Sequence, residues 1–247
     1  MTDRTDPPRS RRERPAKPAL TRAGIVAAAV AIMRAEGLQK VTMRRLAQEL
    51  DTGAASLYVY VRNAAELHAA VLDELLGTVE LPPAGGDWRG RLEQVLTSYT
   101  AVLLEHPGLA QSALVARPSG EHYLNLIEAL LALLDEGGVP SGQAAWGVDL
   151  LLQYATATAA EHATRDGAGD ARSDWDARSE WDALTRALHG ASPQTHPHTA
   201  ALAVQLLSGE PRARLSWGFR MLLNGILHTP VPATPEPPAI PEPPAAA

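Results

Sequence analysis

Residues 42–67 read TMRRLAQELDTGAASLYVYVRNAAEL, a stretch in which two short amphipathic helices are separated by a turn. Thr42 can cap the first helix, because a threonine hydroxyl accepts a hydrogen bond from a backbone N–H of the first turn. The apolar residues of this helix share one stripe, Leu46, Ala47 and Leu50, and the opposite face carries Arg44, Arg45 and Gln48. Residues 51–53 interrupt the pattern with Asp and Gly, which tolerate left-handed backbone conformations. The pattern predicts a helix-turn-helix.

A second helix begins near Ala54, with Leu57 and Val61 spaced i, i+4 as its buried pair. The residues left exposed are small, hydroxylic or phenolic: Ala55, Ser56, Tyr58, Val59 and Tyr60. Side chains of this size and chemistry fit against base edges and phosphates in a major groove. Asn63 and Glu66 have the spacing of a capping box that starts the next helix. The sequence therefore predicts binding to double-stranded DNA.

The charge of the chain is divided between its two parts. The net charge is -6, but residues 1–67 hold 12 Lys or Arg against 7 Asp or Glu, a net of +5. Residues 68–247 hold 10 against 21, a net of -11. A positive N-terminal part on a negative body orients the molecule toward phosphate, which agrees with the helix-turn-helix.

Composition predicts an all-α fold in which a three-helix N-terminal domain is joined by a connector helix to a larger helical body. Ala and Leu dominate, there is one Phe, and β-branched runs are few. Gly and Pro stops delimit the expected helices: 21–36, 63–79, 87–105, 108–116, 120–136, 141–165, 174–189, 197–208 and 210–228. The chain has no cysteine and no apolar run near the roughly 20 residues of a membrane span. We expect a cytoplasmic protein without membrane contact.

The predicted domains are a disordered basic arm (1–18), a helix-turn-helix domain (19–67), a ligand-binding and dimerisation domain (68–229) and a disordered Pro-rich tail (230–247). The arm carries six Lys or Arg and four prolines. It can add phosphate contacts or lie in a minor groove, or it can be a solvated tail. The tail is a plain linker or a docking motif for an aromatic groove.

Both halves of the chain resemble one family. The residues that carry the N-terminal resemblance are Ile25 to Gly37, Val41, Thr42, Leu46, Ala47, Leu50, Leu57, Tyr58, Val61 and Leu67. They resemble the DNA-binding head of the TetR/AcrR family of transcriptional regulators. The body resembles the C-terminal domain of the tetracycline-repressor branch through Trp88, Glu105 to Pro107, Glu136 to Gly138, Trp217 to Phe219 and Leu222 to Gly225.

The resemblance implies a homodimeric repressor whose heads enter successive major grooves of a palindromic operator, about 34–36 Å apart, until a small molecule releases it. By position, Arg44 matches an arginine that contacts guanine through O6 and N7. Thr42, Ser56, Tyr58 and Tyr60 match contacts to phosphate or base edges, and Ala55 and Val59 match positions that meet a thymine methyl. The family usually carries Gly where this chain has Asp51 and Lys where it has Ala64.

The resemblance to the tetracycline-repressor branch places the predicted effector pocket among the helices of the body. Tetracycline repressors chelate drug-bound magnesium through a histidine. The matching position in this chain lies near Val79 and Glu80, where there is no histidine, so tetracycline is not expected as the ligand. No metal and no cofactor are expected either. Polar or aromatic residues expected around the pocket are His106, Gln111, Tyr123, Asn125, Trp146, Tyr154 and His162. Each can instead be an ordinary core or surface residue, and His106 can cap a helix end or face water.

The last helix pair predicts the dimer interface. Its apolar residues exceed what one face of a solvated helix needs: Leu215, Trp217, Phe219, Leu222, Leu223 and Ile226. The long helix 141–165 can complete a four-helix contact. The alternative is that Trp217 and Phe219 belong to the core of one chain.

Two rival functions differ from a ligand-controlled regulator. An enzyme is disfavoured because GxSxG, HExxH, phosphate-loop and cysteine-nucleophile motifs are absent, so no catalytic residue is assigned. His196-Pro197-His198 is too short a cluster for a metal site. A DNA-binding regulator without a small ligand stays open. A body cavity of a few hundred cubic ångströms with convergent polar groups would favour ligand control.

Overall fold

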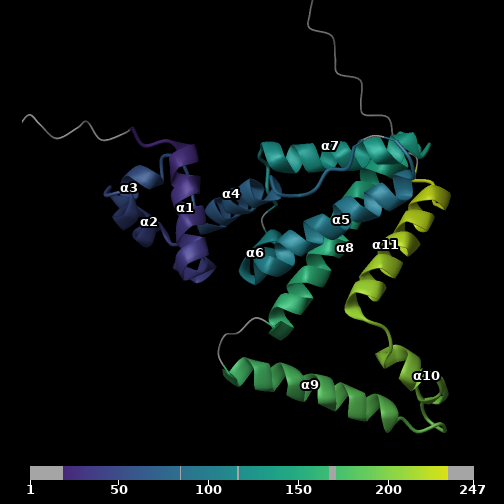
Figure 1. Cartoon of the computed structure of the whole chain (residues 1–247). Helices are drawn as coiled ribbons and strands as arrows, with labels where there is room; N and C mark the ends of the chain where they lie inside the picture. The colour runs from purple at the N-terminus through teal and green to yellow at the C-terminus, as the bar shows by residue number, and fades with distance from the viewer. Residues whose placement is uncertain (1–18, 84, 116, 167–170, 233–247) are drawn as a thin grey trace, which may run out of the picture. The chain divides into compact units, whose positions relative to one another are not determined.

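The computed structural model describes residues 19–232, except residues 84, 116 and 167–170 (Figure 1). The predicted arm and most of the predicted Pro-rich tail lie outside these residues. Within the described ranges every regular element is a helix and no strand occurs, which confirms the all-α fold. The chain forms two compact units, a first unit up to Ala64 and a second unit from Ala65 onward.

The first unit contains α1 (Arg22–Glu36), the short 3-10 helix η1 (Leu38–Lys40), α2 (Met43–Glu49) and α3 (Ala54–Leu57). Helix α1 begins at Thr21, whose side-chain oxygen accepts a 3.1 Å hydrogen bond from the Gly24 amide. It ends at Gly37, where a φ of 88° suits glycine. The core of this unit is apolar and closely packed: Ile25, Ala29, Val41, Leu46, Leu57 and Val61.

The second unit contains the remaining helices. They are α4 (Ala64–Leu76), α5 (Trp88–Glu105), α6 (Pro107–Ala113), α7 (Glu121–Glu136), α8 (Ser141–Asp166), α9 (Ala171–His189), α10 (Pro197–Leu207) and α11 (Pro211–His228). Asp87 caps α5, because its carboxylate accepts hydrogen bonds from the amides of Arg89 and Gly90. Each helix expected from the Gly and Pro stops is present, with ends that differ by a few residues.

Helix α8 is the centre of the second unit, with α5 and α11 packed against it. The Tyr99 hydroxyl on α5 and the Thr156 hydroxyl on α8 lie 2.7 Å apart in a buried hydrogen bond. On another face of α8, the Tyr154 ring meets Phe219 of α11 edge-on, with ring centroids 5.5 Å apart. A Cβ at Gly218 would lie 2.1 Å from the Tyr154 hydroxyl oxygen, so glycine permits this close packing.

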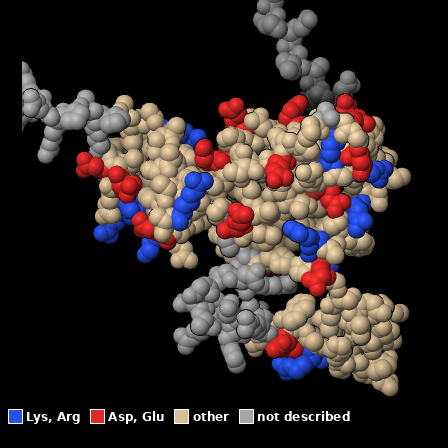
Figure 2. Space-filling view, in the orientation of Figure 1, with Lys and Arg blue, Asp and Glu red and all other residues tan. Residues whose placement is uncertain are grey.

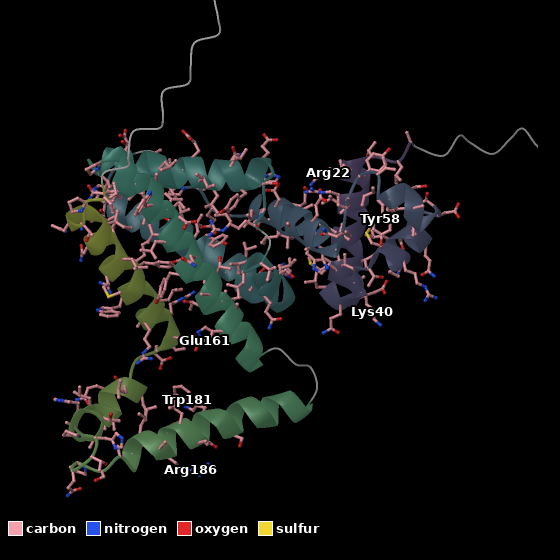
Figure 3. The ribbon with its side chains drawn as sticks, turned by 180° about the vertical axis from the view of Figure 1, so that it is seen from behind. Arg22, Lys40, Tyr58, Glu161, Trp181 and Arg186 are labelled. Carbon is pink, nitrogen blue, oxygen red and sulfur yellow. The ribbon has the colours of Figure 1, made fainter. Side chains whose placement is uncertain are left out.

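Helices α9 and α10 extend the second unit. The α10 segment presents a nearly uncharged surface in Figure 2. Three apolar side chains of this helix are exposed: Leu202, Val204 and Leu206. Trp181 and Arg186 project from opposite sides of α9 (Figure 3). Among the described residues, none of the helices combines the length and the apolar character that crossing a membrane requires.

Candidate nucleic-acid interface and effector pocket

Helix α2 is fixed to the first unit by its cap and by one arginine. The Thr42 side-chain oxygen accepts a 3.1 Å hydrogen bond from the Arg45 amide, as the sequence predicts. The Arg45 guanidinium forms ion pairs with Glu36 of α1 at 2.6 Å and with Glu49 at 2.8 Å. The hydrogen bond from Arg45 lowers the pKa of the Glu36 carboxyl. Arg45 therefore serves the fold, whereas the sequence pattern placed it on a free polar face.

Arg44 has a different environment from its neighbour. Its side chain is exposed, and it forms no hydrogen bond or ion pair with any described residue. A guanidinium in this state offers its full fork of donors to an external acceptor, such as phosphate or the O6 and N7 atoms of guanine. The two consecutive arginines thus divide into one that holds α1 to α2 and one that is available for binding.

The turn between α2 and α3 depends on Asp51. Its φ of 46° is the left-handed conformation that Asp tolerates better than most residues. The Thr52 amide donates to the Ala47 carbonyl at 2.9 Å, which closes the turn. Gly53, in contrast, has a φ of -76° and does not use the freedom that the sequence pattern suggested for it.

Helix α3 spans four residues and continues as a single turn, in which the Val61 amide donates to the Leu57 carbonyl at 3.0 Å. Leu57 and Val61 are both fully buried, as the i, i+4 spacing predicts. Burial of this pair directs the residues between them outward. Tyr58, Val59 and Tyr60 have exposed fractions of 52 %, 80 % and 36 %, and Tyr58 is labelled in Figure 3.

All seven residues predicted to contact DNA are solvent-exposed on the first unit: Thr42, Arg44, Ala55, Ser56, Tyr58, Val59 and Tyr60. The hydroxyl oxygen of Thr42 already caps α2, but its O–H can still donate to a phosphate. This surface combines one cation with hydroxyl and phenol groups and exposed methyl groups. Its chemistry suits phosphates, base edges and thymine methyls.

The second unit holds a small polar cavity between α5, α8 and the segment that joins α6 to α7. Its volume is about 70 Å³. The lining residues are Tyr99, Ala113, Leu114, Arg117, Pro118, Tyr123, Leu152, Gln153 and Thr156. Arg117 pairs with Asp149 of α8 at the edge of this region. Two phenols, a guanidinium and an amide therefore surround one space.

Burial controls the ionisation of both phenols. Desolvation raises the pKa of Tyr99 to about 12, although its hydrogen bond with Thr156 acts in the opposite direction. Desolvation also raises the pKa of Tyr123, against the lowering effect of the Arg117 charge. Both hydroxyls remain protonated at neutral pH. The Thr156 hydroxyl donates to the Leu152 carbonyl, so Tyr99 donates to Thr156 and can only accept a hydrogen bond from a bound molecule. The Tyr123 hydroxyl can donate or accept.

Of the residues predicted for the effector pocket, Tyr123 lines this cavity and the others lie elsewhere. Trp146 lies instead in a groove between α8 and α11, and Tyr154 packs against Phe219 of α11. His106 is half-buried at the junction of α5 and α6, where its carbonyl accepts hydrogen bonds from the Leu109 and Ala110 amides. The remaining predicted residues are outside the cavity lining, two of them exposed and one half-buried: Gln111, Asn125 and His162.

Sequence reasoning missed Tyr99, Arg117, Gln153 and Thr156. Tyr99 had a detectable signal, because it falls on the apolar stripe of Leu92, Leu96 and Leu103 and is therefore a polar group on a buried face. Arg117 lies in a loop, where periodicity says nothing about direction.

The residues predicted for the dimer interface separate into two groups. Four are buried within their own chain and offer little surface to a partner: Leu215, Phe219, Leu223 and Ile226. Trp217 is 61 % exposed, and Leu222 lines an open apolar groove of about 550 Å³ between α8 and α11. Trp146, Leu150 and Met221 line the same groove. Phe219 is therefore a core residue of its own chain, as the alternative predicted, whereas Trp217 is exposed and is not part of that core.

Two family descriptions match the chain and together span most of the described residues. Residues 25–71 match the bacterial regulatory proteins of the tetR family, and residues 81–229 match the tetracyclin repressor-like C-terminal domain. The chain belongs to the TetR family of bacterial transcriptional regulators. Members of this family are DNA-binding regulators rather than enzymes.

Several TetR-family relatives come from Streptomyces. The transcriptional repressor DrrR1 of Streptomyces coeruleorubidus is 34 % identical over 145 residues, which are 58 % of this chain and 54 % of the repressor. The chain thus spans about half the length of that curated relative. SCO7704 of Streptomyces coelicolor, a proposed transcription regulator, is 58 % identical with a TM-score of 0.75, covering 89 % of this chain and 100 % of that one. ActR of the same species, crystallised with actinorhodin, is 35 % identical with a TM-score of 0.72, covering 85 % and 96 %.

The departures from the TetR pattern can be placed in this structure. The positive φ of Asp51 explains why glycine is usual at that position in the family. Ala64, which replaces a usual lysine, is exposed at the start of α4 and carries no cation for a phosphate. Val79 is buried and Glu80 is exposed at the position that matches the magnesium-binding histidine.

Arg44→Ala tests the available guanidinium. We expect a loss of about 1–3 kcal/mol in specific DNA binding and a relaxed preference at one base pair per half-site, because a bidentate guanine contact would be removed. Competition binding with single-base operator variants measures both effects. Gln48→Ala, on the same exposed face, is the matched control with little expected change. An equal loss on every DNA sequence would show that Arg44 contacts only phosphate.

Proposed function

We propose that this protein is a homodimeric repressor that binds a palindromic operator and leaves it when a small molecule occupies the second unit. The observation that carries this proposal is the exposed surface of Arg44, Ser56, Tyr58, Val59 and Tyr60, held in place by the buried Leu57 and Val61. In a dimer, two such surfaces would enter successive major grooves about 34–36 Å apart. Because the proposed partner is operator DNA, we place the protein in the cytoplasm.

The residues around the cavity support an aromatic effector that carries an acidic oxygen. Tyr99 and Tyr123 supply aromatic edges and hydroxyl groups, and Arg117 supplies a positive charge. A carboxylate or phenolate can compete with Asp149 for that guanidinium. The actinorhodin complex of ActR makes actinorhodin a reasonable first compound to test.

The alternative function is DNA binding without a small-molecule effector. The 70 Å³ cavity favours it, since pockets for drug-sized ligands measure roughly 300–1,000 Å³. Ligand control therefore requires that the cavity enlarges.

Selection of bound duplexes from a random pool, repeated with actinorhodin and with a panel of other aromatic acids and phenols, tests the proposed function and its alternative. We expect an enriched palindrome whose half-sites are about 10–10.5 base pairs apart. We also expect release of that DNA with at least a roughly fivefold loss of affinity when the effector binds. An enriched palindrome that responds to no compound would support regulation without a ligand, and a pool without symmetry would refute the dimeric repressor.

The apolar groove between α8 and α11 supports dimerisation with a second copy of the chain. Its rim exposes Trp146, Leu150 and Met221, and the neighbouring Trp217 is also exposed. Monomeric proteins rarely leave a contiguous apolar surface of this kind in water. An isologous contact would bury the same residues of both copies.

Trp146→Glu tests this interface by placing a charge in the groove. We expect the variant to sediment as a monomer, because the carboxylate would lose its hydration in the dimer. Leu124→Glu on α7 is the matched control, since Leu124 is 60 % exposed and Trp146 is 61 % exposed, and we expect it to remain dimeric. A Trp146→Glu protein that stays dimeric would place the interface elsewhere.

A further inference from the structure

Helix α7 receives its N-terminal cap from another helix. Its own N-cap residue is Gly120, which has no side chain to accept a backbone hydrogen bond. The amide of Tyr123, the third residue of α7, instead donates a 3.0 Å hydrogen bond to the carboxylate of Asp73 on α4. This amide is the one that an N-cap side chain ordinarily binds. Asp73 of α4 therefore caps the N-terminus of α7, as Asp87 caps the N-terminus of the helix that directly follows it, α5.

Gly120 is required for this contact. A Cβ at this position would lie 2.0 Å from a carboxylate oxygen of Asp73, a distance that excludes any side chain while Asp73 stays in place. Gly120 thus has no side chain that could cap α7, and it leaves the space that the Asp73 carboxylate of α4 occupies. The two helices lie side by side at this point in Figure 1.

A second polar contact joins α4 to α6. His68 Nδ1 lies 3.3 Å from the Ser112 hydroxyl oxygen. That hydroxyl also lies 2.9 Å from the Gly108 carbonyl, and the His68 tautomer protonated at Nδ1 satisfies both contacts. The buried Nε2 of the same ring has no partner among the described residues. Helix α4 is therefore held at Ser112 and at Tyr123, on either side of the segment 113–122.

The described residues of this segment, 113–115 and 117–122, form one wall of the cavity. Ala113, Leu114, Arg117 and Pro118 line the cavity from it. The opposite wall consists of buried residues of α5 and α8, joined by the Tyr99–Thr156 hydrogen bond. Val115, in contrast, is 88 % exposed. A molecule larger than 70 Å³ would displace the exposed residues of this wall more easily than the buried wall. The residues that flank this wall, Ser112 and Tyr123, are both bonded to α4.

We propose that Asp73 is the positioning residue that couples the effector cavity to the DNA-binding unit. Displacement of the start of α7 breaks or moves the bond between the Tyr123 amide and Asp73, which alters the restraint on α4. Helix α4 begins at Ala64, the last residue of the first unit, so this restraint is passed on through continuous backbone. This inference rests on the proposed function. Coupling between binding sites is reciprocal, so operator binding must also change the α7 cap.

Four variants separate coupling from simple helix capping. Asp73→Ala removes the cap and the link to α4, whereas Asp73→Asn keeps an acceptor oxygen and should restore both. Asp73→Ala combined with Gly120→Ser supplies α7 with a local cap but leaves it unlinked from α4. The backbone of Gly120, with φ -89° and ψ -174°, accepts a serine once the carboxylate is gone. Asp87→Ala is the control, because it removes a cap that α5 makes with its own flanking residue.

The measurement is amide hydrogen exchange at Tyr123 in the full chain, with and without the selected operator duplex. We expect operator binding to slow this exchange about fivefold or more in the wild type, in Asp73→Asn and in Asp87→Ala. In free Asp73→Ala, exchange should be about fivefold faster than in the wild type. The double variant should exchange slowly and should not respond to the operator.

The outcomes distinguish this inference from the proposed function. If the wild-type chain binds no operator, the proposed function fails, and Asp73 has no DNA-binding output to couple. If the wild type binds operator but exchange at Tyr123 is unchanged, the coupling role of Asp73 is refuted while DNA binding stands. A double variant that responds to operator as the wild type does would also refute it.

Discussion

Burial of Leu57 and Val61 is the interaction on which the DNA-binding surface depends. A helix of four residues cannot persist on its own in water, because nucleation costs more than its few hydrogen bonds return. Packing of these two side chains into the core with Leu46 supplies the missing stability. The same packing fixes which side chains face outward, since Tyr58, Val59 and Tyr60 occupy the positions between the two anchors.

Two side-chain contacts between helices stabilise the two units, one in each unit. In the first unit, Arg45 forms ion pairs with Glu36 and Glu49, whereas Arg44 on the same helix α2 stays exposed. In the second unit, Asp73 of α4 caps α7 across space. Both contacts join helices that are separate in the sequence. In the coupling that we propose, a change at the cavity reaches α4 through the Asp73 contact while the core formed by α5 and α8 stays in place.

The features that were predicted from sequence are those that local chemistry determines. Thr42 begins its helix as a cap, Gly37 ends α1, and the i, i+4 spacing of Leu57 and Val61 gives the correct buried pair. The features that were missed depend on residues far apart in the chain. The pairing of Arg45 with Glu36 requires the angle between α1 and α2, which the sequence pattern does not contain.

The surroundings of the predicted pocket and interface residues were harder to predict because α8 packs on several sides. Thr156 faces α5, Tyr154 faces α11, and Trp146 is exposed beside α11, although all three lie on one helix. Polarity alone cannot assign such residues to a cavity, a core or an exposed groove. Arg117 gave no signal because a loop has no periodic face. Only the arrangement of neighbouring helices determines these roles.

The most direct measurement of the central claim, that the exposed face next to Leu57 reads base edges, is a double-mutant cycle between Val59→Ala and thymine-to-uracil changes in the selected operator. Removal of a methyl that Val59 contacts should weaken wild-type binding by about 1 kcal/mol. We predict that this penalty disappears in Val59→Ala at one thymine per half-site, which is a coupling energy of at least about 0.5 kcal/mol. A uracil penalty of the same size in both proteins at every thymine would contradict the account.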